Sequence, residues 1–207
     1  MHPTYFPSVA HFAAMMQYNI VFEVQDNYQK QTYRNRAYIY SPSGKQLLTV
    51  PVKHTGKDGH QQYKEVKIEY AFNWPKQHWK TLETAYRSSP FFEFYEDDIL
   101  PVFEKKHTCL IDLAMETIAL VCGCLHIDVP AESTADYSEG VGNMLDMRYL
   151  TDAKKGPGFN FEAYRQVFGE KFGFISNLSI LDLLFNEGPG AVAYLARQNL
   201  SSASTGK

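Results

Sequence analysis

The sequence predicts an α/β fold arranged as a single domain, with a mixed β-sheet in its N-terminal part and a helix-rich C-terminal half. Up to residue 70, short segments rich in β-branched and aromatic residues are separated by turn residues, which is typical of strands. Beyond residue 73, longer segments place apolar side chains at helical spacing. A chain of 207 residues is long enough to bury one substantial core.

Four strands and one helix are expected in the N-terminal part. The strands cover residues 19–25, 32–41, 46–52 and 65–70, and the helix covers residues 9–17. Pro42, Ser43 and Gly44 are turn residues between the second strand and the third. The polar stretch 53–62 contains two glycines and is expected to be a mobile loop.

Helices are expected to dominate after Asn73 and Pro75, which are typical of a helix start. They cover residues 76–87, 91–106, 107–125, 178–187 and 188–198, and the third is apolar around most of its circumference, as a central helix would be. A strand at 126–134 and strand-like or mixed segments at 143–152 and 161–168, around a turn at 156–158, complete the pattern. Residues 1–200 are expected to form the domain, and residues 201–207 a disordered tail.

The overall charge excludes several classes of partner. The net charge is −3 and the isoelectric point about 6.2, so no general attraction to nucleic acid is expected. No signal peptide is visible, and the longest apolar run, at 117–125, is too short to cross a bilayer. We therefore expect a cytoplasmic protein without an integral membrane segment.

The cysteines and carboxylates predict no metal site and no cofactor. Cys122 and Cys124 lie in an apolar run with no second Cys or His pair, which favours buried thiols. Asp112 and Glu116 have the spacing of a helical carboxylate pair, but no Glu-x-x-His segment accompanies them, which favours a solvated stripe. Dinucleotide-binding, P-loop and serine-nucleophile patterns are also absent from the sequence.

The segment QKQTYRNR, at residues 29–36, concentrates three cations in an acidic chain. If it is extended, Lys30, Arg34 and Arg36 share one face. Arginine side chains suit phosphate or carboxylate groups, so one interpretation is an anion clamp. The other is a solvated face that pairs with carboxylates of the same chain, for which the candidates are Glu23, Asp26, Glu65 and Glu69.

His78 is the candidate general base. It lies near the start of an expected helix, where the helix dipole lowers the pKa of an imidazole and keeps it neutral near pH 7. A neutral imidazole can accept a proton from a substrate. The alternative is a histidine that only packs or hydrogen-bonds at the helix start. His2 and His11 flank an expected strand–loop–helix and weakly suggest a nucleotidyl transferase loop.

Several stretches in order and spacing resemble the WbqC-like family. They are PTYFP at 3–7, YQKQTYRNR at 28–36, LTVPV at 48–52, HWKTLETAYR at 78–87, SPFFEFY at 89–95 and LSILDLLFNEGP at 178–189, and they cover nearly the whole chain. The sequence departs from the family pattern in places. His2-Pro3 stands for Gln-Pro, and the positions of a paired aspartate are Val24 and Gln25, with Glu23 and Asp26 beside them.

The resemblance implies a role in bacterial surface-polysaccharide (O-antigen) biosynthesis. It implies an acyl or aminoacyl transferase that moves glycine or another acyl group to a nucleotide-linked aminosugar. The positions that match the family pattern are Tyr5, Lys30, Arg34, Asn35, Arg36, His78, Trp79, Tyr86 and Asn186. Among them we expect His78 to be catalytic, and the residues expected to bind substrate or phosphate are Tyr5, Lys30, Arg34, Asn35, Arg36, Tyr86 and Asn186.

Two other functions stay open. One is a non-catalytic protein that binds a nucleotide-sugar, another anionic small molecule or an enzyme of the same pathway. The other is an ATP-dependent nucleotidyl or aminoacyl-activating enzyme, suggested by the expected strand–loop–helix at 2–16.

Overall fold

The computed structural model describes residues 1–53, 61–153 and 158–200. Its helices are α1 (Val9–Gln17), α2 (Trp74–Tyr86), α3 (Phe92–Glu104), α4 (Leu110–Leu125), α5 (Gly169–Phe172), α6 (Ile180–Glu187) and α7 (Gly190–Arg197). Three short 3₁₀ helices lie at Tyr33–Asn35, Tyr63–Glu65 and Arg148–Thr151. Over the described residues, no helix combines the length and the apolar character that a membrane span needs.

The strands form two separate pairs. Strand β1 (Val21–Phe22) runs parallel to β4 (Glu132–Ser133), whereas β2 (Arg36–Ser41) and β3 (Gly44–Thr49) form an antiparallel hairpin. In the hairpin Arg36 lies opposite Thr49 and Ser41 opposite Gly44, whose φ of 96° suits glycine at the turn. The expected α/β class, with mixed strand directions and one domain, is confirmed.

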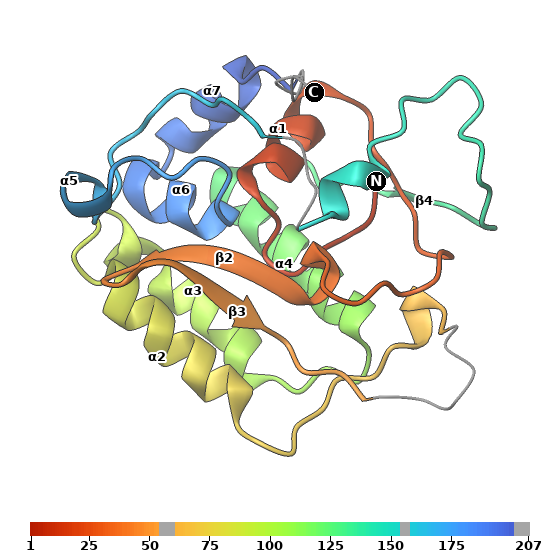
Figure 1. Ribbon diagram of the computed structural model, residues 1–207, viewed down its shortest axis with the longest axis horizontal. Coiled ribbons are helices and arrows are strands. Elements are labelled where there is room, and N and C mark those ends of the chain that lie inside the picture. Colours follow the sequence, from red (N-terminus) through yellow and green to blue (C-terminus); the bar gives the residue numbers. More distant parts are fainter. Residues whose placement is uncertain (54–60, 154–157, 201–207) are drawn as a thin grey trace.

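The hairpin lies between two groups of helices. Figure 1 shows it crossing the molecule with α2 and α3 on one side and α1, α6 and α7 on the other, while α4 lies behind it. Strand β2 contacts both α2 and α6, and α3 packs on α4. The buried face of α4 includes Leu113, Ile118 and Val121, so it is the central helix expected from its apolar circumference.

The segment before α1 and the segment before α6 are joined through their backbones. The N–H of Val9 donates to Leu178 O at 2.9 Å, and the N–H of Ile180 donates to Pro7 O at 2.7 Å. Phe6, just before these bonds, has a φ of 37°, and its N–H donates to the Thr117 hydroxyl. These bonds place the loop before α1 against the start of α6.

Several expected elements are wrong in extent. The segments 19–25 and 126–134 keep only the two-residue strands β1 and β4, and 65–70 makes isolated bridges in place of a strand. Of the strand-like segments, 143–152 contains a 3₁₀ helix and 161–168 has no regular structure. Outside these two-residue strands and bridges, the segments have no ladder partner among the described residues, and alternation alone does not supply one.

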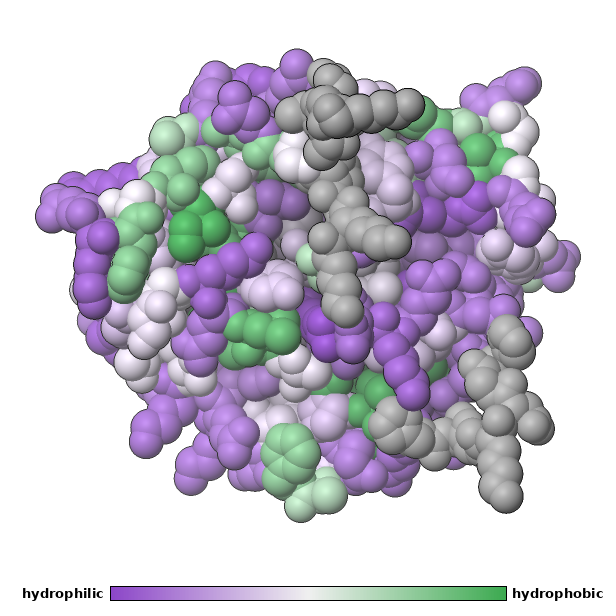
Figure 2. Space-filling model, in the orientation of Figure 1, coloured by the Kyte–Doolittle hydropathy of each residue, from purple (hydrophilic) through white to green (hydrophobic). Residues whose placement is uncertain are grey.

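The domain limits stay a prediction. The expected tail, residues 201–207, and most of the expected loop at 53–62 lie outside the described residues. The same holds for the first part of the expected turn at 156–158. Figure 2 shows one face of the molecule, on which hydrophilic side chains dominate and hydrophobic ones form small separate patches.

Candidate functional site

The basic segment is not an extended strand. Residues Tyr33–Asn35 form a turn of 3₁₀ helix, Gln31 has a φ of 64°, and β2 begins only at Arg36. The expected single face for Lys30, Arg34 and Arg36 is therefore wrong, because alternation requires extended backbone throughout. Lys30 is exposed, whereas Arg34 is 1% exposed.

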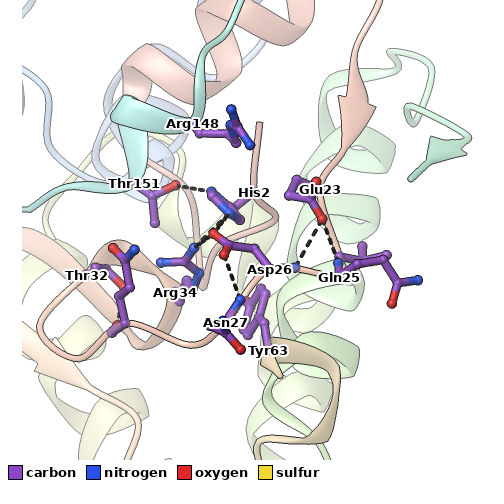
Figure 3. Close-up of polar contacts among 12 residues, drawn as sticks. His2, Glu23, Gln25, Asp26, Asn27, Thr32, Arg34, Tyr63, Arg148 and Thr151 are labelled. Atoms are coloured by element: carbon purple, nitrogen blue, oxygen red, sulfur yellow. Dashed lines mark hydrogen bonds and ion pairs between the residues drawn. The ribbon is translucent and has the colours of Figure 1, made fainter. Parts of the chain in front are cut away.

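Arg34 meets His2 and Asp26 inside the molecule. Its Nη2 lies 2.7 Å from His2 Nε2 and donates to Asp26 Oδ2 at 3.0 Å. His2 Nε2 lies 2.8 Å from the same carboxylate oxygen, and His2 Nδ1 lies 3.2 Å from Thr151 Oγ1. Figure 3 shows these side chains converging from the N-terminal loop, the segment before Tyr28, and the 3₁₀ helix at Arg148–Thr151. We call His2, Asp26, Arg34 and Thr151 the His2 cluster.

Local structure fixes each member of the His2 cluster. Glu23 Oε1 accepts from the N–H groups of Gln25 and Asp26, which turns the chain so that the Asp26 carboxylate faces Arg34. The Tyr63 hydroxyl donates to Pro3 O and holds the loop that carries His2. The Arg34 guanidinium lies 5.4 Å from the centre of the Tyr63 ring, within cation–π range.

The His2 cluster faces a cavity of about 280 Å³. Its walls are His2, Asp26, Gln29, Arg34, Tyr137, Arg148, Tyr149, Thr151 and Asp152. Arg148 is bound by Asp146, with Nη2 2.7 Å from Oδ2, so its charge is compensated. Arg34 Nε is buried and has no hydrogen-bond partner among the described residues. A buried donor without a partner is a position at which an added acceptor would be favourable.

The pKa values in the cluster follow from burial and contact. Burial lowers the pKa of His2, which outweighs the opposing effect of its hydrogen bond with Asp26. Burial by itself would raise the pKa of Asp26, but the hydrogen bond with His2 and the charge of Arg34 leave it lowered. Near neutral pH the cluster therefore holds a neutral imidazole, a carboxylate and a guanidinium.

His78 lies elsewhere in the interior. Its Nδ1 lies 3.0 Å from the hydroxyl of Tyr5, and its ring packs on Trp74 at 5.0 Å between ring centres. Burial lowers the pKa of His78 to about 4, so the imidazole is neutral, and burial rather than the helix dipole is the main cause. His78 is not among the residues that line the cavities described, and its catalytic role stays a prediction.

Tyr86 and Asn186 lie apart from both the His2 cluster and His78, in a network of hydrogen bonds around Asp182. The fully buried Asp182 carboxylate accepts from the hydroxyls of Tyr86 and Tyr164 and from Gln166 Nε2. Asn186 Nδ2 donates to the Asp182 carbonyl, and Asn186 lines a cavity of about 540 Å³. The expected binding residues are thus not brought into one pocket.

The remaining expected residues have separate positions. Asn35 Nδ2 donates to Val50 O at 2.8 Å and anchors the start of β2 to the end of β3. Arg36 is half-buried, with its Nε lacking a partner among the described residues. Among the described residues, no group of three or more His, Cys, Asp or Glu side chains has the arrangement of a metal site.

The sequence contained partial signs of the His2 cluster. His2 and Asp26 stand out where the chain departs from the family pattern, but nothing in the spacing brings them to Arg34. Thr151 and Arg148 carry no recognisable pattern, since both come from an irregular segment more than one hundred residues away in sequence. Only the tertiary structure joins these residues.

Comparisons with known proteins agree with the resemblance in the sequence. Residues 2–155 match the model of the WbqC-like protein family. A curated relative from Mycobacterium tuberculosis, described as the uncharacterized protein Rv1507c, is 31% identical over 197 residues, covering 81% of this chain and 83% of the relative. No solved structure gives a significant match. The family match contains the whole His2 cluster and ends before Asn186.

Proposed function

This chain belongs to the WbqC-like protein family, and from that membership we propose that it transfers an acyl group, such as glycine, to a nucleotide-linked aminosugar. The pathway would be that of bacterial surface polysaccharides, including O-antigen. The diphosphate of the nucleotide-sugar would bind in the cavity beside the His2 cluster. The observation that supports this proposal is the buried guanidinium of Arg34 in the cavity wall.

Arg34 is suited to a phosphate group. A guanidinium is always charged and offers several donors in a plane, and phosphate oxygens can accept two of them at once. Arg34 keeps one donor, Nε, without a partner among the described residues. Its attraction for an anion is strengthened by low exposure to water, which weakens screening. Lys30 is exposed to water and lacks this advantage.

The test is calorimetric titration of the protein with UDP- and dTDP-linked aminosugars. We expect binding tighter than about 1 mM and a loss of at least about tenfold in affinity for Arg34→Ala, since truncation removes a charge-assisted bond. Because Arg34→Ala leaves Asp26 without its partner, Arg34→Lys is measured in parallel, and circular dichroism checks that both variants are folded. Lys30→Ala is the matched control and should bind like the unmodified protein.

Transfer itself needs a second measurement. The protein is incubated with an activated glycyl or other acyl donor and the bound aminosugar, and the acylated sugar is detected by mass spectrometry. Absence of aminosugar binding, or equal affinity in folded Arg34→Ala, contradicts the proposal. Loss of transfer in His78→Asn with unchanged aminosugar binding would support the predicted catalytic role of His78.

A non-catalytic nucleotide-sugar-binding protein of the same pathway is the second candidate. The buried position of His78, with Nδ1 at the Tyr5 hydroxyl and away from the cavity of the His2 cluster, favours this candidate. It predicts aminosugar binding without acyl transfer and co-purification with a pathway enzyme.

A further inference from the structure

Three polar atoms of the His2 cluster form a nearly equilateral triangle. Arg34 Nη2, His2 Nε2 and Asp26 Oδ2 are separated by 2.7, 2.8 and 3.0 Å. All three distances are within hydrogen-bonding range. The three side chains come from separate parts of the chain, and His2 and Arg34 are almost fully buried.

The available protons cannot satisfy all three sides of this triangle. An arginine nitrogen only donates and an ionised carboxylate only accepts, whereas a neutral imidazole nitrogen does one or the other. If His2 carries its proton on Nδ1, Nε2 accepts from Arg34 but faces the lone pairs of Asp26. If the proton is on Nε2, it is donated to Asp26 but the Arg34 N–H groups oppose it. In each tautomer one of the three contacts is therefore unfavourable, and burial away from water increases its cost.

The two tautomers of His2 treat Thr151 differently. With the proton on Nδ1, His2 donates to Thr151 Oγ1, whereas with the proton on Nε2, Nδ1 accepts from the Thr151 hydroxyl. The second state is a hydroxyl–imidazole–carboxylate relay of the kind that activates hydroxyl nucleophiles. The 2.7 Å contact from Arg34 opposes this state.

We infer that a phosphate-type anion bound to Arg34 in the cavity draws the guanidinium from His2 and moves the His2 proton from Nδ1 to Nε2, which completes a Thr151–His2–Asp26 relay. Arg34 lines the cavity of about 280 Å³, which offers space for such a group, and its buried Nε is a donor without a partner among the described residues. The identity of the natural anion rests on the proposed function, but the coupling itself does not.

In this relay Thr151 is the hydroxyl that gains basic character. Its proton is shared with His2 Nδ1, while His2 Nε2–H is held by Asp26, so no net charge is created in the resting relay. Occupancy by the anion would therefore prepare Thr151 for proton transfer only when substrate is present. Burial, which lowers the pKa of His2, favours the neutral imidazole that this exchange of tautomers requires.

Other charged and titratable groups surround the triangle. Those that act on His2, Asp26 or Arg34, or line the cavity, are the Met1 amino group, Glu23, Tyr28, Tyr63, Tyr137, Arg148, Tyr149 and Asp152. Arg148 remains bound to Asp146 and to the carbonyls of Ser138 and Glu139. Of the groups that contact His2, Arg34 is therefore the one that we expect a bound anion to displace.

The tautomer is measured by nitrogen NMR of protein labelled with ¹⁵N-histidine, titrated with inorganic pyrophosphate at pH 7.5. The His2 signals are assigned by their loss in His2→Gln. We expect Nδ1 to change from a protonated to an unprotonated chemical shift, and Nε2 to change in the opposite sense, with the same midpoint as pyrophosphate binding measured by calorimetry.

Variants separate the two parts of the inference. Arg34→Gln should lose at least about tenfold in pyrophosphate affinity and show the Nε2–H tautomer before any anion is added. Asp26→Asn removes the carboxylate acceptor, so pyrophosphate should bind without an exchange of tautomers.

Each contrary result has a definite meaning. Pyrophosphate binding with unchanged His2 signals, or no pyrophosphate binding at all, overturns the inference. Undiminished acyl transfer to an aminosugar by folded Thr151→Val overturns the relay and leaves the proposed function standing. A pyrophosphate-driven exchange of tautomers without aminosugar binding supports the inference and contradicts the proposed function.

Discussion

Buried polar side chains, more than exposed charges, hold together the parts of this protein that the sequence pattern singles out. Arg34 is fixed by Asp26 and His2, and Tyr86 by Asp182, although both stand among residues expected to bind a ligand. The types of residue at these positions were predictable. Their partners were not, because Asp182 lies 96 residues beyond Tyr86 and nothing local links them.

At Tyr86, loss of the hydroxyl should destabilise the fold. The hydroxyl donates to Asp182 Oδ1 at 2.8 Å and accepts the Tyr40 N–H at 3.0 Å, so Tyr86→Phe leaves that buried N–H unpaired. We expect the free energy of unfolding to fall by roughly 1–3 kcal/mol in urea titrations. Tyr95→Phe is the control, since the Tyr95 ring is buried but its hydroxyl makes no hydrogen bond to the described residues and is not among the buried polar atoms without a partner, and it should change stability by less than about 0.5 kcal/mol. Equal effects would contradict the importance of the Asp182 network.

Among the elements, helices were predicted far better than strands. The expected helices at 76–87, 91–106 and 178–187 match α2, α3 and α6 within a few residues, because each carries its own apolar periodicity. The segments at 19–25 and 65–70 alternate like strands, but a strand needs a partner that its own sequence does not specify. The prediction of an extended strand at 29–36 was wrong for a further reason, because the positive φ of Gln31 interrupts the alternation of side chains.

Substitution of two glycines measures how closely side chains pack around the helices. Gly188 separates α6 from α7 with a φ of 53°, and an added Cβ would lie 2.6 Å from the Phe91 ring. Gly188→Ala should lower the free energy of unfolding by roughly 1–3 kcal/mol through overpacking, and by about 1–2 kcal/mol more through the left-handed backbone. Gly123→Ala, in α4 with no atom within 4 Å of the new Cβ, should raise it by roughly 0.5–1 kcal/mol. Chemical denaturation of both variants measures this difference, and a destabilised Gly123→Ala or a neutral Gly188→Ala would contradict it.

For the whole molecule, class and organisation were predictable but the site was not. Composition, length and periodicity together specify one α/β domain with helices in its second half. The His2 cluster depends on contact between the segment at 134–152 and the N-terminal loop. Such a segment has no hydrophobic periodicity from which its position could be predicted. The expected binding residues fall in separate places because several of them, including Tyr5 and Asn35, hold the interior together.

Stability of the whole fold should decrease in mild acid. Burial lowers the pKa of His11 to about 3 and that of His78 to about 4, whereas an unfolded histidine titrates near 6.5. Below pH 6.5 the unfolded chain binds protons that the folded chain does not, so each histidine removes about 1.4 kcal/mol per pH unit until its folded pKa is reached. Asp182, whose pKa burial raises, acts in the opposite sense.

Urea unfolding at pH 7, 6, 5 and 4.5 measures this dependence. The unmodified protein should lose stability steadily below pH 6.5. The double variant His11→Asn, His78→Asn should start less stable and show a slope shallower by about two protons. An unchanged slope in that variant would show that other groups are responsible.

The backbone bonds that join Pro7 and Val9 to Leu178 and Ile180 also set an order of assembly. About 170 residues must leave the ribosome before these partners exist, and contacts so distant in sequence form slowly. A nascent chain that has emerged only to residue 155 would contain every side chain of the His2 cluster. It would still lack α6 and α7, against which α1 packs, so the helix that follows the loop carrying His2 would be uncovered. Synthesis of α6 and α7 is therefore the step at which a chaperone or protease would compete with completion of the fold.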